Sequence, residues 1–302
     1  MRVTSDYIGR CGDLSRGAVR LAFHDAGTFS LRLAALGLPN GAADGSFLWD
    51  PEEVLREENN GLQSITAALT PLPEKFGVSP GDVLQLAGVL GVIACPGGPR
   101  IDVWVGRPEP LNVAPTGLLP SPFDSVPNLT GRFADMGFAA TDLIALLGAH
   151  GTAKQFFVDP DFAGESMDST VDIWDVNFYN DTTVANPPPG VFRFQSDVNF
   201  AHNASTMAEF HGYIDNQPDW DQDYRAAHLL MSTLGYNTSD LTNCTELMPA
   251  SINLTLVSVP DASGILHVDP VLLEAATQKY RAPWLESNTC VDGIRCQTPN
   301  RE

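Results

Sequence analysis

An arginine and a histidine lie four residues apart in the segment RLAFHD, residues 20–25. In a helix, Arg20 and His24 would share one face, because side chains at positions i and i+4 are neighbours there. A neutral imidazole can move a proton between two oxygen atoms, and an adjacent guanidinium stabilises the negative charge left on the departing oxygen. The pair taken alone also fits a solvated ionic patch, so its interpretation depends on a second motif.

The second motif is LLGAHGT, residues 146–152, in which an apolar helix ends in a histidine between small residues. Small neighbours would let a planar ligand come close to His150, and histidine is a common axial ligand of haem iron. Taken alone, this motif also fits a core histidine hydrogen-bonded to the backbone. Found in one chain, the two motifs favour a haem site with an acid–base group on its opposite side.

The rest of the pattern indicates an all-α, predominantly helical protein, with Pro- and Gly-rich loops and few of the alternating runs typical of strands. We expect Asp13 to cap a helix that runs to about Ala26 and carries the first motif. A second helix is expected over 61–70, and Ser79 followed by Pro80 should open a buried helix that includes residues 83–95.

Two further helices are expected in the second half of the chain. One opens at Thr141-Asp142 and ends at His150, and the other is capped by Asp219 and ends before Gly235. Residues 96–127 are punctuated by proline and glycine, which indicates a long connection between lobes. The predicted organisation is a first helical lobe over 1–125, a second helical lobe over 126–260 and an extended tail over 261–302.

The charge balance excludes several classes of partner. The 302 residues include 17 basic and 37 acidic side chains, a formal net charge of −20, whereas nucleic acids and anionic membranes are bound by basic surfaces. The longest apolar run, residues 83–95, is too short for the ~20 residues of a membrane span. We therefore expect neither a nucleic-acid nor a membrane partner.

Six Asn-x-Ser/Thr acceptors and five scattered cysteines favour a secreted, extracellular glycoprotein. Residues 1–6 show no apolar core of a secretory signal, so we expect that a signal was removed or that this sequence starts after it. The odd number of cysteines leaves one thiol without a partner in the chain. The acceptors are Asn128, Asn180, Asn203, Asn237, Asn243 and Asn253, and the cysteines are Cys11, Cys95, Cys244, Cys290 and Cys296.

The order of the motifs resembles that of the fungal secretory (class II) haem peroxidases of the plant-type superfamily. The match extends to about residue 250 and implies two helical lobes with haem b between them. Its motifs are RLAFHD at 20–25, NNG at 59–61, CPGGPR at 95–100, GRP at 106–108, LGAH at 147–150, QSD at 195–197 and LTNC at 241–244.

The resemblance implies a role for each matching residue on the peroxide side. His24 would be the distal acid–base group, Arg20 its electrostatic partner and Phe23 the aromatic ring over the haem. Asn59 would hold the other ring nitrogen of His24, with Glu53 helping to orient that asparagine. Hydrogen peroxide would be the oxidant.

On the opposite side of the haem, the resemblance implies that His150 ligates the iron. Asp197 would accept the second N–H of this ring and so increase electron density at the metal. Met167 stands at a position that is usually aromatic in the family, and we interpret it as core filling by a flexible side chain.

Two calcium sites are also implied, because their oxygen-rich side chains suit a hard cation. A proximal site would lack one side-chain oxygen, since Gly151 stands where the family has Ser or Thr, and it would be weaker or completed by water. The distal set is Asp25, Asp44, Ser46 and the Ala42 carbonyl. The proximal set is Gly151, Asp168, Thr170, Asp175 and the Ile173 carbonyl.

Departures from the family narrow the expected substrates. The positions of the manganese-binding carboxylates are Asp13, Gly17 and Phe156, too few carboxylates for Mn(II). The position of the surface tryptophan that oxidises lignin models is Ala145. The expected function is therefore peroxide-dependent, one-electron oxidation of small phenolic or aromatic donors at the haem edge by a monomer. The alternative is a secreted, non-catalytic haem-fold glycoprotein that serves binding or structure.

The resemblance also implies a disulfide between Cys11 and Cys95. The family's usual partner of Cys244 lies in an N-terminal segment that this sequence lacks, which would leave Cys244 free. Cys290 and Cys296 are predicted to pair with each other, and the alternative is that either of them bonds to Cys244.

Overall fold

The computed structural model describes residues 11–253, 258–260, 266–268 and 271–272. The described chain is mostly helical, as predicted. The α-helices are α1 Asp13–Ala26, α2 Leu31–Ala35, α3 Ser46–Trp49, α4 Gln63–Leu69, α5 Leu72–Phe76, α6 Pro80–Ala94, α7 Val126–Met136, α8 Ala140–Leu147, α9 Asn177–Thr183, α10 Gln195–His202, α11 Met207–Gly212 and α12 Gln217–Ser232.

Short 3-10 turns and strand pairs complete the described structure. The strands form two antiparallel pairs, β1 with β2 and β3 with β4. The 3-10 turns are η1 Glu53–Leu55, η2 Glu57–Asn59, η3 Gly148–Thr152, η4 Pro160–Phe162, η5 Thr238–Asp240 and η6 Thr245–Leu247. The strands are β1 Trp104–Val105, β2 Thr242–Asn243, β3 Ser258–Pro260 and β4 Leu266–Val268.

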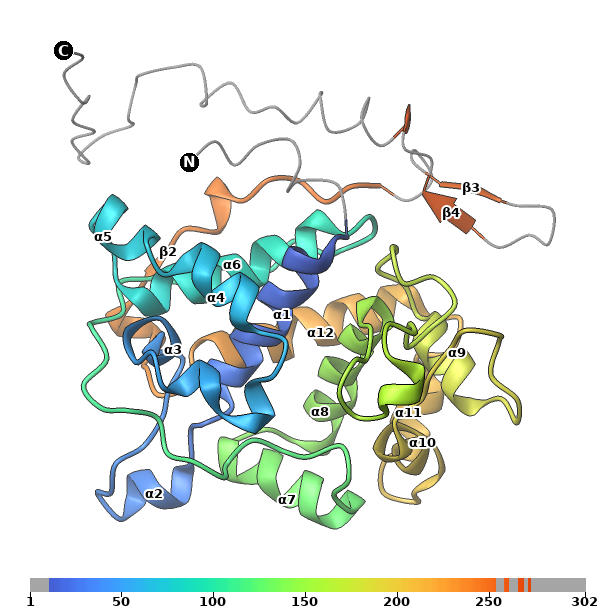
Figure 1. Cartoon of the computed structure of the whole chain (residues 1–302), viewed down its shortest axis with the longest axis horizontal. Coiled ribbons are helices and arrows are strands. Elements are labelled where there is room, and N and C mark those ends of the chain that lie inside the picture. Colours follow the sequence, from blue (N-terminus) through green and yellow to red (C-terminus); the bar gives the residue numbers. More distant parts are fainter. Residues whose placement is uncertain (1–10, 254–257, 261–265, 269–270, 273–302) are drawn as a thin grey trace.

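Helices from the two halves of the chain occupy opposite sides of the molecule. Figure 1 shows α2 to α5 on the left and α9 to α11 on the right, with α1, α8 and α12 near the middle. The connection over 95–125 forms no helix, as its proline and glycine content predicts. The lobe boundary near residue 125 stays a prediction, and most of the predicted tail over 261–302 lies outside the described residues.

The two central helices approach closely because α6 presents glycines to α1. A Cβ atom on Gly88 would lie 2.5 Å from the Cβ of Ala22, and one on Gly91 would lie 2.6 Å from the backbone oxygen of Ser15. The predicted opening of α6 is confirmed, since the Ser79 hydroxyl accepts a hydrogen bond from the Asp82 N–H at 3.2 Å.

The second half is built around stacked aromatic rings. Trp174 and Trp220 stack with ring centroids 5.3 Å apart, and Tyr224 packs edge-on against Trp174. The Trp220 N–H donates to the Ala145 carbonyl at 2.9 Å and so joins α12 to α8. All four residues are buried, so these large rings serve the core.

Several predicted helix boundaries were wrong. The α1 helix is preceded by Gly12 as its cap, and Asp13 lies in its first turn without a capping bond. Asp219 likewise lies inside α12, which begins at Gln217 because the following proline fits the first helical turn. The second helix begins at Gln63, since Gly61 has a φ of 91° that a helix excludes.

One covalent bond joins α6 to the start of α1. The predicted Cys11–Cys95 disulfide is present and closes a separation of 84 residues. By loop entropy alone, such a bond stabilises the fold by about 4 kcal/mol. Among the described residues Cys244 forms no disulfide, and the predicted pairing of Cys290 with Cys296 lies outside them.

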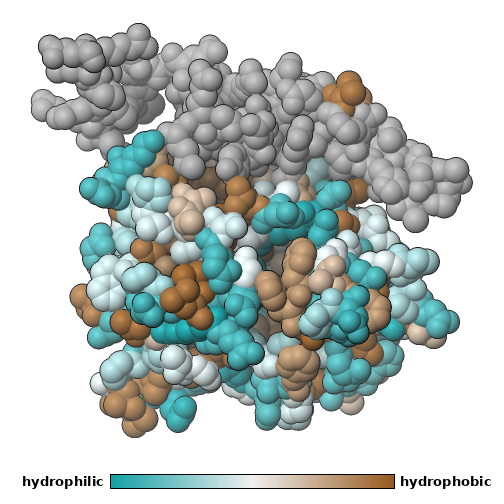
Figure 2. All heavy atoms as spheres, in the orientation of Figure 1, coloured by the Kyte–Doolittle hydropathy of each residue, from teal (hydrophilic) through white to brown (hydrophobic). Residues whose placement is uncertain are grey.

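The surface carries no continuous apolar belt on the face shown in Figure 2, where brown groups are separated by teal and white ones. One brown group lies over α2 at the lower left. Leu31, Leu36 and Leu38, within and just after α2, are exposed by about half or more. None of the described helices is long and apolar enough to cross a membrane.

The glycine contact between α1 and α6 makes a testable prediction. Gly91→Ala should lower the free energy of unfolding by about 1–3 kcal/mol, because the added methyl group must displace the backbone of α1. The matched control is Gly131→Ala on α7, where nothing lies within 4 Å of the added Cβ and stability should rise by up to about 1 kcal/mol. Chemical denaturation of the three proteins measures both changes. An unchanged stability for Gly91→Ala would contradict the close contact.

Candidate active site

The paired residues of the first motif lie on one face of α1 and contact each other. The Arg20 Nε–H donates to His24 Nε2 at 3.1 Å. Two backbone carbonyls hold the other end of the guanidinium, since Nη1 donates to Asn60 at 2.7 Å and Nη2 to Glu58 at 2.9 Å. Burial lowers the pKa of Arg20 to about 10, so the group stays cationic at neutral pH.

Asn59 fixes the other nitrogen of the His24 ring. The Asn59 Nδ2 donates to the Glu53 backbone carbonyl at 2.7 Å, which turns Oδ1 toward His24 Nδ1 at 2.8 Å. A neutral ring in this network carries its proton on Nδ1 and a lone pair on Nε2. It is the carbonyl of Glu53, and not its carboxylate, that orients the asparagine.

The imidazole of His24 is held in its neutral form. Burial, reinforced by the Arg20 guanidinium, lowers its pKa to about 3, and the hydrogen bond with Asn59 opposes this only in part. At neutral pH the basic nitrogen of His24, Nε2, therefore carries no proton, so this side chain can act as a base. Phe23, the neighbouring residue, stacks on Phe133 with ring centroids 5.7 Å apart.

The second motif does not end as an α-helix. Helix α8 stops at Leu147, and His150 lies in the following 3-10 turn, η3. Its Nδ1 lies 3.0 Å from Asp197 Oδ2 on the buried first turn of α10. The rings of Phe178 and Phe194 pack edge-on against the imidazole, with centroids 5.7 and 5.6 Å away.

This arrangement suits a haem iron ligand. A carboxylate on Nδ1 fixes the tautomer and leaves Nε2 as the nitrogen that can bind a metal. Within the described part of the chain, Nδ1 is the ring nitrogen engaged in a hydrogen bond. The orientation of the His150 ring therefore fits a ligand of haem iron. His24 supplies an acid–base group elsewhere in the same fold.

The predicted distal calcium residues lie close together around Asp25, the residue that follows His24. Both carboxylate oxygens of Asp25 accept from the Gly45 N–H, at 3.0 and 3.1 Å, and Oδ2 accepts from Gln85 Nε2 at 3.0 Å. Burial, with Asp44 and Glu53 nearby, raises the pKa of Asp25 well above its usual range. Several acidic groups are thus buried close together, and a bound cation would stabilise their ionised forms.

Orphaned oxygens support the same conclusion. The Ser46 hydroxyl and both Glu53 carboxylate oxygens are buried without a hydrogen bond of good geometry among the described residues, although Arg56 Nη1 lies 3.9 Å from Glu53 Oε1. A buried polar atom without a partner is costly, and oxygen ligation of a hard cation would satisfy it. The oxygen donors of the set, which includes Asp44 and the carbonyl position Ala42, are of the type that calcium prefers, although the described residues contain no cluster of three or more acidic, histidine or cysteine side chains arranged to hold a metal ion.

The proximal set is more compact. The Thr170 hydroxyl lies 3.0 Å from Asp175 Oδ1 and 3.4 Å from Asp168 Oδ2. Burial raises the pKa of Asp168 well above its usual range and that of Asp175 to about 6. Gly151 faces this set, since a Cβ there would lie 3.0 Å from Asp168 Oδ2. A residue with a side-chain oxygen at 151 would point at the carboxylates.

The structure gives physical reasons for the departures from the manganese-binding pattern. The exposed Asp13 carboxylate pairs with Arg16 at 3.1 Å. A Cβ on Gly17 would lie 3.2 Å from Ile65 Cγ2, which restricts any side chain at this position. Phe156, at the third position, is 48% exposed and offers no ligand atom.

Two other positions named from the sequence lie in the core. Ala145 is fully buried under Trp220, so in this chain the position cannot present any side chain to a surface substrate. Met167 is also buried, as core filling requires. Sequence reasoning did not single out Arg16, Gln85 or the aromatic pair around His150.

Comparison with known proteins identifies the family of this chain. A family model described as peroxidase matches residues 2–216, and the chain belongs to the peroxidase family.

Its relatives are fungal. Ligninase H2 of Phanerodontia chrysosporium is 34% identical over 260 residues, which cover 80% of this chain and 70% of the relative. Manganese peroxidase 3 of Phlebia radiata is 34% identical over 258 residues, covering 80% and 71%. Versatile peroxidase VPS1 of Pleurotus eryngii is 32% identical over 286 residues, covering 89% and 77%.

Proposed function

We propose that this protein is a secreted, monomeric haem b peroxidase with two calcium ions, which oxidises small phenolic or aromatic donors with hydrogen peroxide. The observation that carries the proposal is the chain of contacts Arg20–His24–Asn59, because it leaves a neutral imidazole beside a fixed guanidinium. A binding or structural haem protein would have no use for this pair, and the alternative of a non-catalytic glycoprotein is therefore disfavoured.

Four residues have distinct roles in the proposed reaction. Haem held through His150 would supply the redox-active iron that is oxidised by peroxide and reduced by the donor one electron at a time. His24 Nε2 takes a proton from one peroxide oxygen and returns it to the other, which leaves as water. Arg20 stabilises the negative charge that develops as the oxygens separate. Asp197 orients the His150 ring through its contact with Nδ1.

The calcium sets support this machinery from both sides. Asp25 follows His24 directly, so a cation held by Asp25, Asp44, Ser46 and the Ala42 carbonyl fixes the end of the distal helix. Asp168, Thr170, Asp175 and the Ile173 carbonyl would hold the second ion against Gly151, close to His150. The distal ion binds more firmly, because Gly151 contributes no side-chain oxygen to the proximal one.

The first prediction from the proposed function concerns the peroxide step. Haem-loaded enzyme should show a shift of its Soret band when peroxide is added, and His24→Ala should slow that shift by about 10²–10⁴-fold because the proton carrier is lost. Stopped-flow absorbance measures both rates. His202→Ala, on the exposed part of α10, is the control and should leave the rate unchanged. A wild-type enzyme that binds haem but gives no Soret shift would contradict the proposed function.

The second prediction concerns the donor. Steady-state oxidation of a small phenol should be fast, whereas oxidation of Mn(II) and of a bulky high-potential dye should be slow, since Asp13 is paired and the other two positions lack carboxylates. Rates with the three donors under identical peroxide concentrations make the comparison. Saturable Mn(II) oxidation at micromolar concentrations would show that another carboxylate set binds the ion.

The third prediction concerns calcium. Exhaustive chelation of the haem-loaded enzyme should let the distal helix relax until His24 approaches the iron, which changes the absorption spectrum and ends activity. Metal analysis should show that one calcium ion per protein is lost more readily than the other, and added calcium should restore the spectrum if the fold persists. An unchanged spectrum and rate in a sample proved free of calcium would refute this role.

A further inference from the structure

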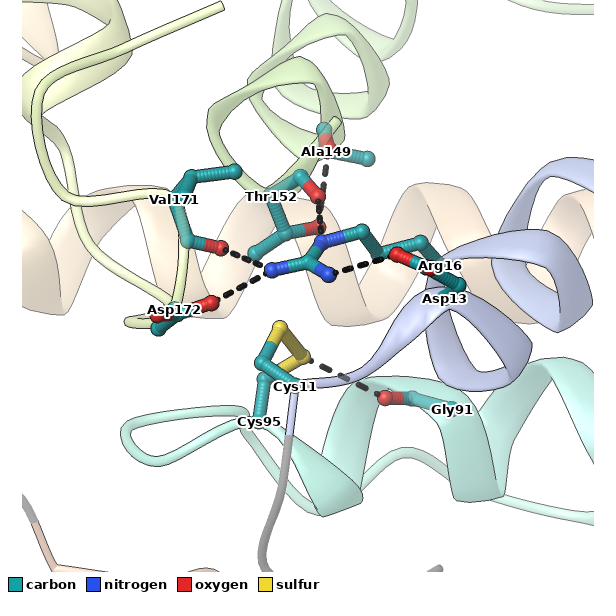
Figure 3. Close-up of a disulfide and its surroundings, with 9 residues drawn as sticks. All are labelled: Cys11, Asp13, Arg16, Gly91, Cys95, Ala149, Thr152, Val171 and Asp172. Atoms are coloured by element: carbon teal, nitrogen blue, oxygen red, sulfur yellow. Dashed lines mark hydrogen bonds and ion pairs between the residues drawn. A yellow bond between two sulfur atoms is a disulfide. The ribbon is translucent and has the colours of Figure 1, made fainter. Parts of the chain in front are cut away.

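Arg16 reaches from the distal helix to the turn that carries His150. It lies on α1 one turn before Arg20, and its side chain is 12% exposed. Its Nε–H donates to the Thr152 carbonyl at 2.7 Å, and its Nη2 donates to the Val171 carbonyl at 3.2 Å. Figure 3 shows the guanidinium between these groups and the Cys11–Cys95 disulfide.

Two carboxylates complete the surroundings of this guanidinium. Asp172 accepts from Nη2 at 2.5 Å and Asp13 accepts from Nη1 at 3.1 Å. Both carboxylates are largely exposed, at 70% and 88%, so their contribution is screened by water and salt. The bonds to the two backbone carbonyls are less exposed, and they define which segments Arg16 holds together.

The bond to Thr152 acts on the turn that contains His150. Thr152 is the last residue of η3, where backbone carbonyls lack partners within the turn. Its own hydroxyl donates to the Ala149 carbonyl at 3.2 Å, and the Ala153 N–H donates to the His150 carbonyl at 2.8 Å. Arg16 therefore satisfies the open end of a five-residue turn whose 3-10 geometry is weak on its own.

Because α1 also carries Arg20 and His24, Arg16 connects the peroxide side directly to the turn on the iron side. A guanidinium is planar and presents its donors in a fixed fork, so it constrains direction as well as distance. A lysine would keep the charge but lose this fork.

We propose that Arg16 is a positioning residue that fixes His150 relative to Arg20 and His24. Its loss would loosen the His150 turn and the hold of that turn on haem, beyond any general loss of stability. This inference rests on the proposed haem function, which places the iron at His150.

The test compares Arg16→Ala and Arg16→Lys with a matched control, Arg132→Ala. Arg132 is an equally buried arginine on α7, with a side chain 14% exposed and an ion pair to Asp135 at 3.1 Å. It donates to the Gly27 and Phe29 carbonyls, just after the end of α1, at 2.7 and 2.6 Å, and none of its hydrogen bonds reaches the His150 turn. Its removal therefore costs a similar set of bonds elsewhere in the fold.

Three measurements on the haem-loaded proteins report on the turn itself. They are hydrogen exchange of the peptide spanning residues 148–155, the iron–histidine stretching band of the ferrous protein, and the rate of haem transfer to apomyoglobin. Arg16→Ala should raise exchange and haem transfer by about tenfold, as expected for the loss of a charge-assisted hydrogen bond. The stretching band should shift, and Arg16→Lys should give intermediate values.

Arg132→Ala should lower the melting temperature without changing any of the three. If Arg16→Ala lowers the melting temperature as Arg132→Ala does and leaves all three unchanged, Arg16 is only a stabilising residue and the proposal is wrong. If Arg16→Ala does not fold, Arg16→Lys decides by the same criteria. A wild-type protein that fails to respond to peroxide contradicts the proposed function instead, and the exchange comparison remains a separate result because it needs no turnover.

Discussion

The contact between α1 and α6 is the constraint on which the site depends. Glycines at 88 and 91 let the two backbones approach to a distance that any side chain would prevent. This approach places Gln85 of α6 within 3.0 Å of the Asp25 carboxylate. The disulfide at Cys95 then fixes the end of α6 to the beginning of α1. The helix that carries the acid–base pair is thus held along its whole length by one neighbour.

A single helix face organises both sides of the site. Arg16, Arg20 and His24 are spaced four residues apart, so their side chains follow one another along α1. The first contacts the turn of His150, the second anchors to carbonyls of the η2 region, and the third meets Asn59. The opposite face of α1, which includes Asp25, is buried against α6. A displacement of α1 would therefore alter the Arg20–His24 pair, the His150 turn and the buried carboxylate of Asp25 together.

Local sequence patterns predicted the parts of this architecture that depend on neighbouring residues. The helical period of apolar residues predicted α1, and the Ser79-Pro80 pair predicted the start of α6. The ends of helices were less predictable, because Asp13 and Asp219 are good capping residues that here lie inside the first turn. The resemblance to a family named the site residues. Neither source indicated the reach of Arg16 to Thr152, across 136 residues of sequence, because such contacts depend on tertiary packing.

Burial has opposite consequences for the two adjacent residues His24 and Asp25. Loss of water disfavours the charged form of each, which lowers the pKa of the imidazole and raises that of the carboxyl group. The lowered pKa of His24 serves the proposed chemistry, since it keeps Nε2 unprotonated at neutral pH. Burial of Asp25 would be a cost to stability if its carboxyl group stayed ionised alone. The calcium ion of the proposed function would remove this cost at Asp25, while backbone carbonyls hold Arg20 and the Asn59 side chain holds His24. Burial of one helix end thus keeps the His24 imidazole neutral and leaves the adjacent Asp25 carboxyl group to be neutralised, by a proton or by a bound cation.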